Sequence, residues 1–443
     1  MKITFAVNKI IVRFGITDAL YRSTAWAGNI VSSALIALVA GFGPSGILLS
    51  SFVQLLISSV LEIPTGLLAD KYGHKNAVIL GFSLKVFVTL FFAVSFYFAV
   101  QKNTGAAYIF LALEATLDAF ANSFINGAYQ AAFSRHYTQE CLQRNIDPKN
   151  APSLFLASFK YGVPLRMAIP LAFALGSWWL SFHSAMRIEY MGAILLFAVF
   201  MMRFVVIAKV FSDLKTLPSS DDNPHKTANS FYELAMTAKR ELLANPSLTA
   251  MFVAGDLAQL ATSMYFLARS FALLQASGIP DSYVWLGGML CAIGLQFTII
   301  LVSRVVYPKL TTVGAKKHIP LWILSTGILF AINALFSHFA QSELIHFAVN
   351  SICAIAISVL AGGISRGATS LALGVIAHNS SATWLSGAST IALFLFSLVS
   401  GLAVSFQMPS IENFYVCCGF AIIQFLIAFH LYTVSGERGL NYF

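Results

Sequence analysis

A few acidic side chains stand inside long apolar runs of the sequence. Glu114 and Asp118 interrupt the run 106–132, and Asp256 interrupts the run 248–276. An ionised group in hydrocarbon costs at least about 2.5–3.5 kcal/mol, so such a group normally faces the protein interior or a water-filled cavity. A carboxylate in that setting can bind and release a proton. These three residues are therefore candidates for proton coupling, with Asp118 first among them.

Two basic residues in the next apolar run lie at depths in the membrane similar to those of Glu114 and Asp118. At a rise of 1.5 Å per helical residue, Glu114 and Arg166 fall at the same level, and Asp118 and Lys160 agree within about one turn. Both carboxylates could then pair with a base. Such a pair could hold two helices together. It could also act as a switch, because a carboxylate that loses its base to a substrate becomes easier to protonate.

Further polar residues recur every three or four positions in four of the apolar runs, which places them on one face of each helix. We expect these faces to line a cavity and to contact a substrate. Two of these residues have an alternative role: Arg269 could form an outer gate, and His346 could be a structural polar group. The substrate-binding candidates are Arg22, Trp26, Asn29, Asn122, Asn126, Lys160, Arg166, Gln259, Arg269, His346 and Asn350.

The elements that carry these residues must be membrane-spanning helices. The chain has 443 residues, of which 58% are hydrophobic and 10% charged, whereas soluble domains are about 25% charged. A helix needs about 20 apolar residues to cross a bilayer. The composition excludes a soluble, disordered or collagen-like chain and predicts an all-α protein with twelve transmembrane helices. The apolar runs are 17–40, 46–69, 76–100, 106–132, 152–177, 187–208, 248–276, 283–307, 319–339, 343–365, 380–405 and 411–434.

The net charge of +9 follows from the placement of the basic residues. Lys and Arg gather in alternate loops, and by the positive-inside rule those loops and both termini are cytoplasmic. The charge therefore reports topology and does not predict nucleic-acid binding. The five Cys form no CxxC pair, so we expect neither a metal site nor another cofactor.

One polar segment divides the chain in two. Residues 209–247 carry ten charges and three prolines, and the second half of this segment has the pattern of an amphipathic helix. We therefore predict an N-terminal six-helix bundle at 1–208, a cytoplasmic linker at 209–247 and a C-terminal six-helix bundle at 248–443.

The most specific pattern, LEIPTGLLADKYGHK at residues 61–75, stands at the end of the second apolar run. A Gly here lets another helix approach closely, and the Asp can bond the N-terminus of a helix. The residues that carry the pattern are Glu62, Gly66, Asp70, Lys71, Gly73 and Lys75.

This pattern resembles the signature of the major facilitator superfamily, in the form found in many bacterial members. The resemblance implies two pseudo-symmetric six-helix bundles that rock about a central site, with the signature as a latch between them. It also implies a cavity lined by spans one, four, seven and ten.

We accordingly expect a secondary active transporter that moves a small polar or anionic solute, such as an organic acid or a chelator-like metabolite, by proton-coupled alternating access. The alternatives are a proton antiporter that exports drugs or amphipathic metabolites, or a non-transporting sensor or lipid scramblase with the same fold. We do not expect this protein to be an enzyme. We expect the protein to lie in a bacterial inner membrane and to be a monomer. Its expected partners are the substrate, protons and lipid.

Overall fold

The structure is a computed structural model that describes residues 5–34, 43–147, 154–183, 188–215, 231–278, 312–339, 342–375, 381–404 and 409–438. All regular secondary structure within these residues is helical. Eight of the described segments are long and apolar enough to cross a membrane, which agrees with an integral membrane protein.

The helices of the first half of the chain are α1 (Phe5–Ala34), α2 (Gly43–Tyr72), α3 (His74–Val100), α4 (Thr104–Ile125), α5 (Ala128–Gln143), α6 (Leu154–Ala157), α7 (Phe159–His183) and α8 (Ile188–Lys215). Those of the second half are α9 (Phe231–Ala244), α10 (Pro246–Leu260), the π-helical segment η3 (Ala261–Tyr265), α11 (Phe266–Ala276), α13 (Thr312–Phe339), α14 (Glu343–Val375), α15 (Ser381–Val404) and α16 (Pro409–Arg438). Each apolar run coincides with one or more of these helices, except 283–307, which lies outside the described residues.

The predicted linker differs from the structure at its start. Residues 209–215 continue α8, where Lys209 forms an ion pair with Asp213. Residues 216–230 lie outside the described part of the chain. The amphipathic helix predicted in the second half of the linker is present as α9, and α10 begins directly after it at Pro246.

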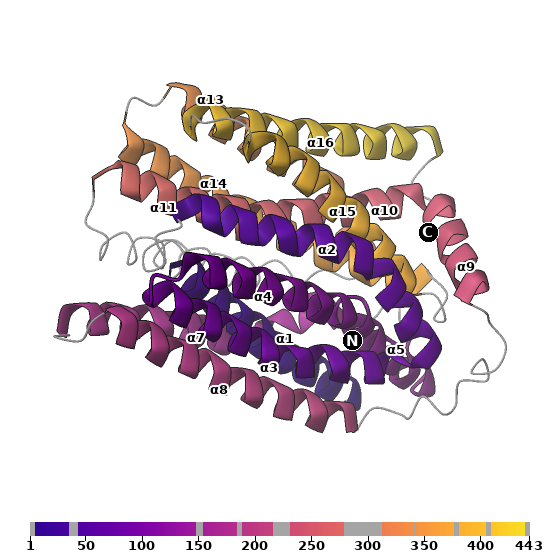
Figure 1. The fold of residues 1–443 in the computed structure, drawn as a ribbon. Helices are drawn as coiled ribbons and strands as arrows, with labels where there is room; N and C mark the ends of the chain where they lie inside the picture. Colours follow the sequence, from indigo (N-terminus) through magenta and orange to yellow (C-terminus); the bar gives the residue numbers. More distant parts are fainter. Residues whose placement is uncertain are drawn as a thin grey trace.

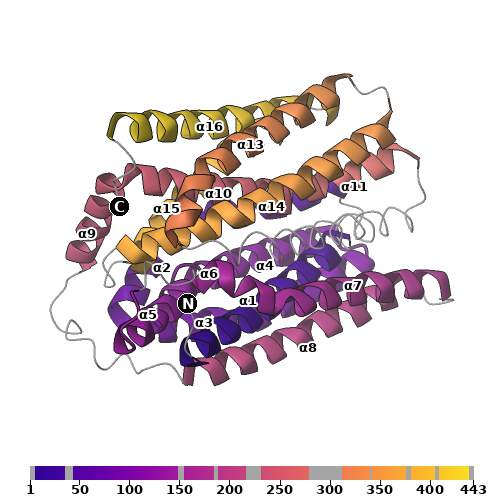
Figure 2. The same cartoon turned by 180° about the vertical axis from the view of Figure 1, so that it is seen from behind.

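The helices run roughly side by side in two groups (Figure 1). Helices α1 and α3 to α8 form one group, and α10, α11 and α13 to α16 form the other, as the reverse view also shows (Figure 2). Helix α2 lies between the groups and packs along α15. Within the first group α7 packs along α1, so helices that are far apart in the sequence can be neighbours in the fold.

Small residues allow the closest helix contacts. A Cβ atom on Gly162 of α7 would lie 2.4 Å from the Cβ of Ala19 and 2.5 Å from the carbonyl oxygen of Gly15, both on α1. Only glycine permits this approach. It brings the middle of α7 against the segment of α1 that carries Asp18. The outer surface is rich in exposed apolar side chains such as Phe197 and Phe429, as expected for contact with lipid.

Candidate functional site

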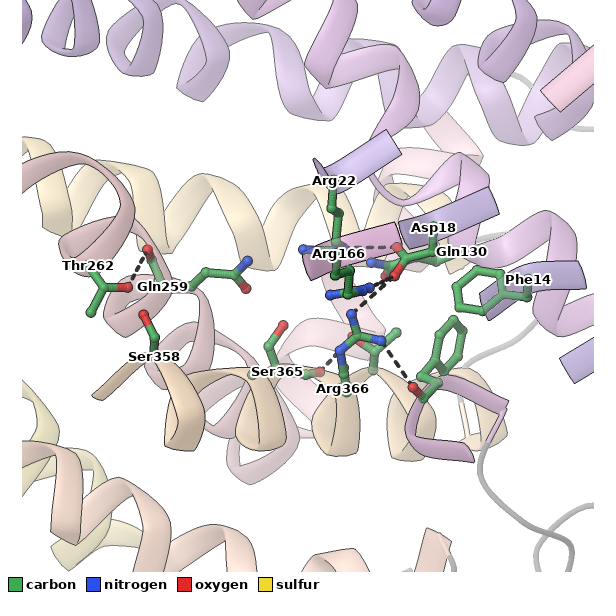
Figure 3. A pocket seen from close by; sticks show the side chains of 13 residues that line it. Phe14, Asp18, Arg22, Gln130, Arg166, Gln259, Thr262, Ser358, Ser365 and Arg366 are labelled. Carbon is green, nitrogen blue, oxygen red and sulfur yellow. Dashed lines mark hydrogen bonds and ion pairs between the residues drawn. The ribbon is translucent and has the colours of Figure 1, made fainter. Parts of the chain in front are cut away.

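Three arginines from three helices surround the carboxylate of Asp18 on α1. The Arg22 Nε atom lies 2.9 Å from Oδ1, and the Arg366 Nη2 atom of α14 lies 3.1 Å from Oδ2. Arg166 of α7 also donates to Oδ2. The Asp18 side chain is only 5% exposed. Guanidinium–carboxylate hydrogen bonds are about twice as strong as neutral ones, so this cluster fixes α1, α7 and α14 relative to one another (Figure 3).

Arg366 ties the two halves of the chain together at this point. Besides its contact with Asp18, its Nη1 atom donates to the carbonyl oxygen of Phe155 at 3.1 Å. Phe155 and Phe14 pack edge to face with ring centroids 5.2 Å apart, and both line the same cavity. An arginine of the second half therefore reaches into the first half beside an aromatic wall.

The cavity around this cluster encloses, together with the space that opens to solvent, about 720 Å³, and it is lined by both halves. Its charged lining residues are three arginines and one aspartate, so the lining is positive. At the other end of the cavity lie Gln259, Thr262 and Ser358 (Figure 3). The remaining polar lining residues are Gln130, Ser365 and Thr369.

The pairing expected between Glu114 and Arg166 is wrong. Arg166 binds Asp18, while Glu114 lies within electrostatic reach of Arg203 and Lys85. The depth of a residue in the membrane does not determine which other helix packs against its own helix. Helix α7, which carries Arg166, packs along α1 and not along α4.

The pairing expected between Asp118 and Lys160 is also wrong. Asp118 forms an ion pair with Lys85 of α3, because α3 is the helix that packs along α4. The Lys160 side chain is exposed, and its Nζ atom lies 4.7 Å from the centroid of the Tyr161 ring. Lys160 is not among the residues that line the cavity.

The Asp118 carboxylate belongs to a second cluster that stays within the first half. Gln54 of α2 donates to it, and the Asn122 Nδ2 atom lies 2.9 Å from Oδ2. Arg203 of α8 donates to the carbonyl oxygen of Lys85 at 2.6 Å. The predicted substrate contact Asn122 is thus a partner of Asp118 in this cluster.

Asp256 and Asn126 each have partners in the protein. The Asp256 carboxylate accepts hydrogen bonds from Ser389 at 2.8 Å and from Ser365 at 3.4 Å. The Asn126 Nδ2 atom donates to Glu62 Oε1 at 2.8 Å. Asp256 is near the cavity, because its partner Ser365 is a lining residue.

His346 and Asn350 belong to a buried network inside the second half. The His346 Nε2 atom lies 2.8 Å from Ser337 Oγ. The Asn350 amide donates to Ser270 at 3.1 Å and accepts from Asn333 at 3.2 Å. These two predicted substrate contacts do not line the cavity.

Arg269 is buried close to this network, within electrostatic reach of His346. It does not line the cavity either. The side chains of Trp26 and Asn29 lie outside the described residues, so Arg22, Arg166 and Gln259 are the predicted substrate contacts that the structure brings together. Among the residues that the structure describes, no group of three His, Cys, Asp or Glu side chains could hold a metal ion.

The signature residue Asp70 caps the N-terminus of α15. Its carboxylate accepts hydrogen bonds from Thr383 N at 2.8 Å, Thr383 Oγ1 at 2.6 Å and Ala382 N at 3.3 Å. The His74 Nε2 atom lies 2.9 Å from Oδ1. A carboxylate at this position binds the free N–H groups and the positive end of the helix dipole. This contact joins the two halves at what we call the Asp70 end of the bundle.

Two glycines of the signature make this contact possible. A Cβ atom on Gly66 would lie 2.8 Å from Ser386 Oγ and 2.9 Å from Thr383 Cα, so α2 and α15 touch here. Gly73 has φ = 99°, a left-handed conformation that suits glycine in the turn between α2 and α3. Of the basic signature residues, Lys71 lies over the Tyr72 ring at 5.7 Å, and Lys75 is partly exposed.

Sequence reasoning missed Asp18 and misread Arg366. Asp18 and Arg22 stand four residues apart at the start of an apolar run, and this spacing is a signal for an ion pair on one helix face. Arg366 directly follows the predicted apolar run 343–365, so the sequence places it outside the membrane-spanning segment. In the structure α14 continues to Val375, so Arg366 lies within the helix and lines the cavity.

Solved structures of membrane transporters are similar to this chain along nearly its whole length. A bacterial homologue of the iron transporter ferroportin in an outward-facing state matches with a TM-score of 0.62 and 15% identity, over 97% of this chain and 100% of that one. The E. coli fucose:proton symporter FucP matches with a TM-score of 0.56 and 15% identity, over 96% and 98%. The human organic anion transporter MFSD10 matches with a TM-score of 0.56 and 12% identity, over the same shares.

No protein-family model matches the sequence, and no curated protein matches it either. The identities to the solved structures are low, so what these proteins share with the chain is the fold.

Proposed function

We propose that this protein is a secondary transporter of the major facilitator superfamily that moves a small organic anion. The observation that carries the proposal is the cavity between the halves, in which three arginines face one aspartate. An anion that enters replaces Asp18 as the partner of one or more guanidinium groups. Because Arg166 belongs to the first half and Arg366 to the second, one bound anion contacts both halves, and binding is coupled to their relative movement.

The Asp70 contact supports alternating access. Asp70, Thr383 and Gly66 join the halves at one end of the bundle. We place this end on the cytoplasmic side of a bacterial inner membrane, with both termini there. The bundles 1–208 and 248–443 then open the cavity to the cytoplasm when the contact breaks. The protein works as a monomer in this account.

Proton coupling is part of the proposal, with Asp118, Glu114 and Asp256 as candidates. Asp256 has the most direct link to the cavity, since it binds Ser365 in the lining and lies within electrostatic reach of Arg22. The similarity to a fucose:proton symporter and to an organic anion transporter supports both features of the proposal.

A second candidate function is export of amphipathic compounds. A smaller cavity of about 370 Å³ lies between α1, α3 and α8, with Tyr21 and Phe82 beside Lys85 and Arg203. Two carboxylates, Asp118 and Glu114, lie within electrostatic reach of these two bases, and balanced charges of this kind suit an apolar solute. We favour the anion because the larger cavity is lined by both halves, as coupled movement requires.

The test is solute uptake by purified protein in proteoliposomes, with organic anions, neutral sugars and amphipathic cations offered under an inward and, separately, an outward proton gradient. We expect uptake of an anion that falls at least about tenfold in Arg366→Gln and is unchanged in the matched control Lys160→Gln. Uptake of cations alone would favour the exporter. Lipid movement without solute flux would favour a scramblase, and either result would overturn the proposal.

A further inference from the structure

The cavity has two ends with different chemistry. Arg22, Arg166 and Arg366 gather around Asp18 at one end (Figure 3). The other end carries only neutral polar groups, namely Gln259, Thr262 and Ser358 from α10, η3 and α14. A ligand that fills the cavity contacts both ends. It should therefore carry an anionic group at one end and neutral polar groups at the other.

The neutral end has hydrogen-bonding capacity that the protein does not use. In the described part of the chain no hydrogen bond is seen for the side-chain amide of Gln259 or for the hydroxyl of Ser358. Thr262 Oγ1 donates to the carbonyl oxygens of Ala258 and Gln259 within its own helix, which leaves its oxygen as an acceptor. Polar groups that face a cavity in this way need water or a ligand as partners. A matching ligand must carry both donors and acceptors.

The side chain of Gln130 adds a third group of this kind. It lines the cavity near Asp18, and no hydrogen bond is seen for its amide among the described residues. Amide groups can donate and accept at the same time. Hydroxyl groups on a ligand are the natural complement, because each of them also does both.

The spacing of the two ends limits the size of the ligand. Ser358 and Arg366 stand eight residues apart on α14, which corresponds to about 12 Å along the helix. The arginine side chain reaches across part of this distance. The remaining span suits a body of roughly six carbon atoms.

We propose that the substrate is a polyhydroxylated acid of about six carbons, a sugar acid or a sugar phosphate, whose anionic group binds Arg22, Arg166 and Arg366 and whose hydroxyl groups bind Gln259 and Ser358. This inference rests on the proposed function and names the substrate class of the same cavity. An unsubstituted acid fills the anionic end but leaves the amide and hydroxyl groups without partners. A neutral polyol does the reverse.

Four six-carbon probes separate these contributions in binding measurements on the purified full-length protein: gluconate, sorbitol 6-phosphate, hexanoate and sorbitol. We expect gluconate or sorbitol 6-phosphate to bind about 10- to 100-fold more tightly than hexanoate, because hexanoate leaves polar groups unpaired. The tighter of the two anions tells whether the cavity prefers a carboxylate or a phosphate. Sorbitol should bind most weakly, since it offers nothing to the arginines.

Variants at the neutral end provide the second readout. Gln259→Leu and Ser358→Ala should each weaken binding of the hydroxylated anion about tenfold and leave hexanoate binding unchanged. The matched control is Ser325→Ala on α13, whose hydroxyl donates to Leu321 of its own helix outside the cavity. This control should change neither affinity.

The outcomes separate the inference from the proposed function. If gluconate, sorbitol 6-phosphate and hexanoate bind equally well, and Ser358→Ala changes none of them, the inference is wrong and the anion site stands. If none of the three anions binds, or if sorbitol binds more tightly than they do, the proposed function fails and the inference fails with it.

Discussion

Polar contacts inside one half of the molecule differ from those between the halves. Asp118 and Lys85 form a balanced pair between neighbouring helices of the first half. Asp18 and Arg366 pair across the interface, at a cavity whose lining has more arginines than aspartates. Asp70 also makes its contact across the interface, with backbone and side-chain groups of α15.

This difference indicates what each kind of contact does. A contact within one half can persist while the halves move, so it stabilises the bundle. A contact between the halves must break and form again as the halves move, so it affects ligand binding and the conformational equilibrium. Changes of the first kind should therefore lower stability alone, whereas changes of the second kind should also alter binding or conformation.

The largest effect is expected at Asp118. Asp118→Leu leaves Lys85 without its carboxylate, and breaking a buried pair in this way costs roughly 3–5 kcal/mol in the free energy of unfolding. The double variant with Lys85→Met should recover most of the loss. Chemical unfolding in detergent micelles measures both. If Asp118→Asn folds normally and loses only its response to a proton gradient, the role of Asp118 is coupling and not stability.

The matching change between the halves is Asp18→Asn. The three arginines then lack their shared carboxylate, so the free energy of unfolding should fall by about 3 kcal/mol in buffer without a bound anion. Added gluconate should restore more stability to this variant than to the wild type, because the anion supplies the missing charge. Thermal unfolding at increasing gluconate concentrations measures the difference. Equal stabilisation of the two proteins would show that the anion does not reach the arginines.

A smaller effect is expected at the contact between α2 and α15. Gly66→Ala places a methyl group against Thr383 Cα, and overpacking of this kind costs about 1–3 kcal/mol. This cost arises only while the Asp70 end is closed, because α2 and α15 are then in contact. The variant should therefore shift the equilibrium toward the state in which this end is open. The distance between spin labels at Leu142→Cys and Leu243→Cys, both exposed near this end, should increase.

The matched control for Gly66 is Gly105→Ala. No atom lies within 4 Å of the methyl group that this change adds to α4. The control should leave the label distance unchanged. If Gly66→Ala also leaves it unchanged, the close approach of α2 and α15 does not determine whether this end is closed.

The smallest effect is expected for Asp70→Asn. The amide oxygen can still accept hydrogen bonds from Thr383, but the amide nitrogen cannot accept one from Ala382 N. The variant therefore loses the long contact to Ala382 and the charge at the N-terminus of α15, which is worth about 0.3–1 kcal/mol. The open population at the Asp70 end should rise about twofold to fivefold, as read from the same spin-label distances. Thr383→Val, which removes only the hydroxyl contact, should shift the equilibrium in the same direction. A shift toward the closed state in either variant would contradict a latch at Asp70.

The sequence predicted the helical membrane fold and the amphipathic helix α9, and its motif singled out Asp70 and Gly66, which contact α15 in the structure. These features depend on local patterns, such as apolar length, periodicity and a motif at a helix end. The ion pairs were predicted wrongly, because depth along a helix does not define its neighbours: Arg166 meets Asp18 on α1 and not Glu114 on α4. The role of Arg366 depended on where α14 ends, and helix ends are the least certain part of a sequence-based prediction.

The most direct test of the account is the dissociation constant of gluconate, measured for the wild type, Arg166→Gln, Arg366→Gln and the double variant Lys85→Met with Asp118→Leu. Each arginine change removes a hydrogen bond to a charged group, so it should weaken binding about 10- to 100-fold. The double variant should keep the wild-type value. Unchanged binding in both arginine variants, or a loss confined to the double variant, would contradict an anion site between the halves.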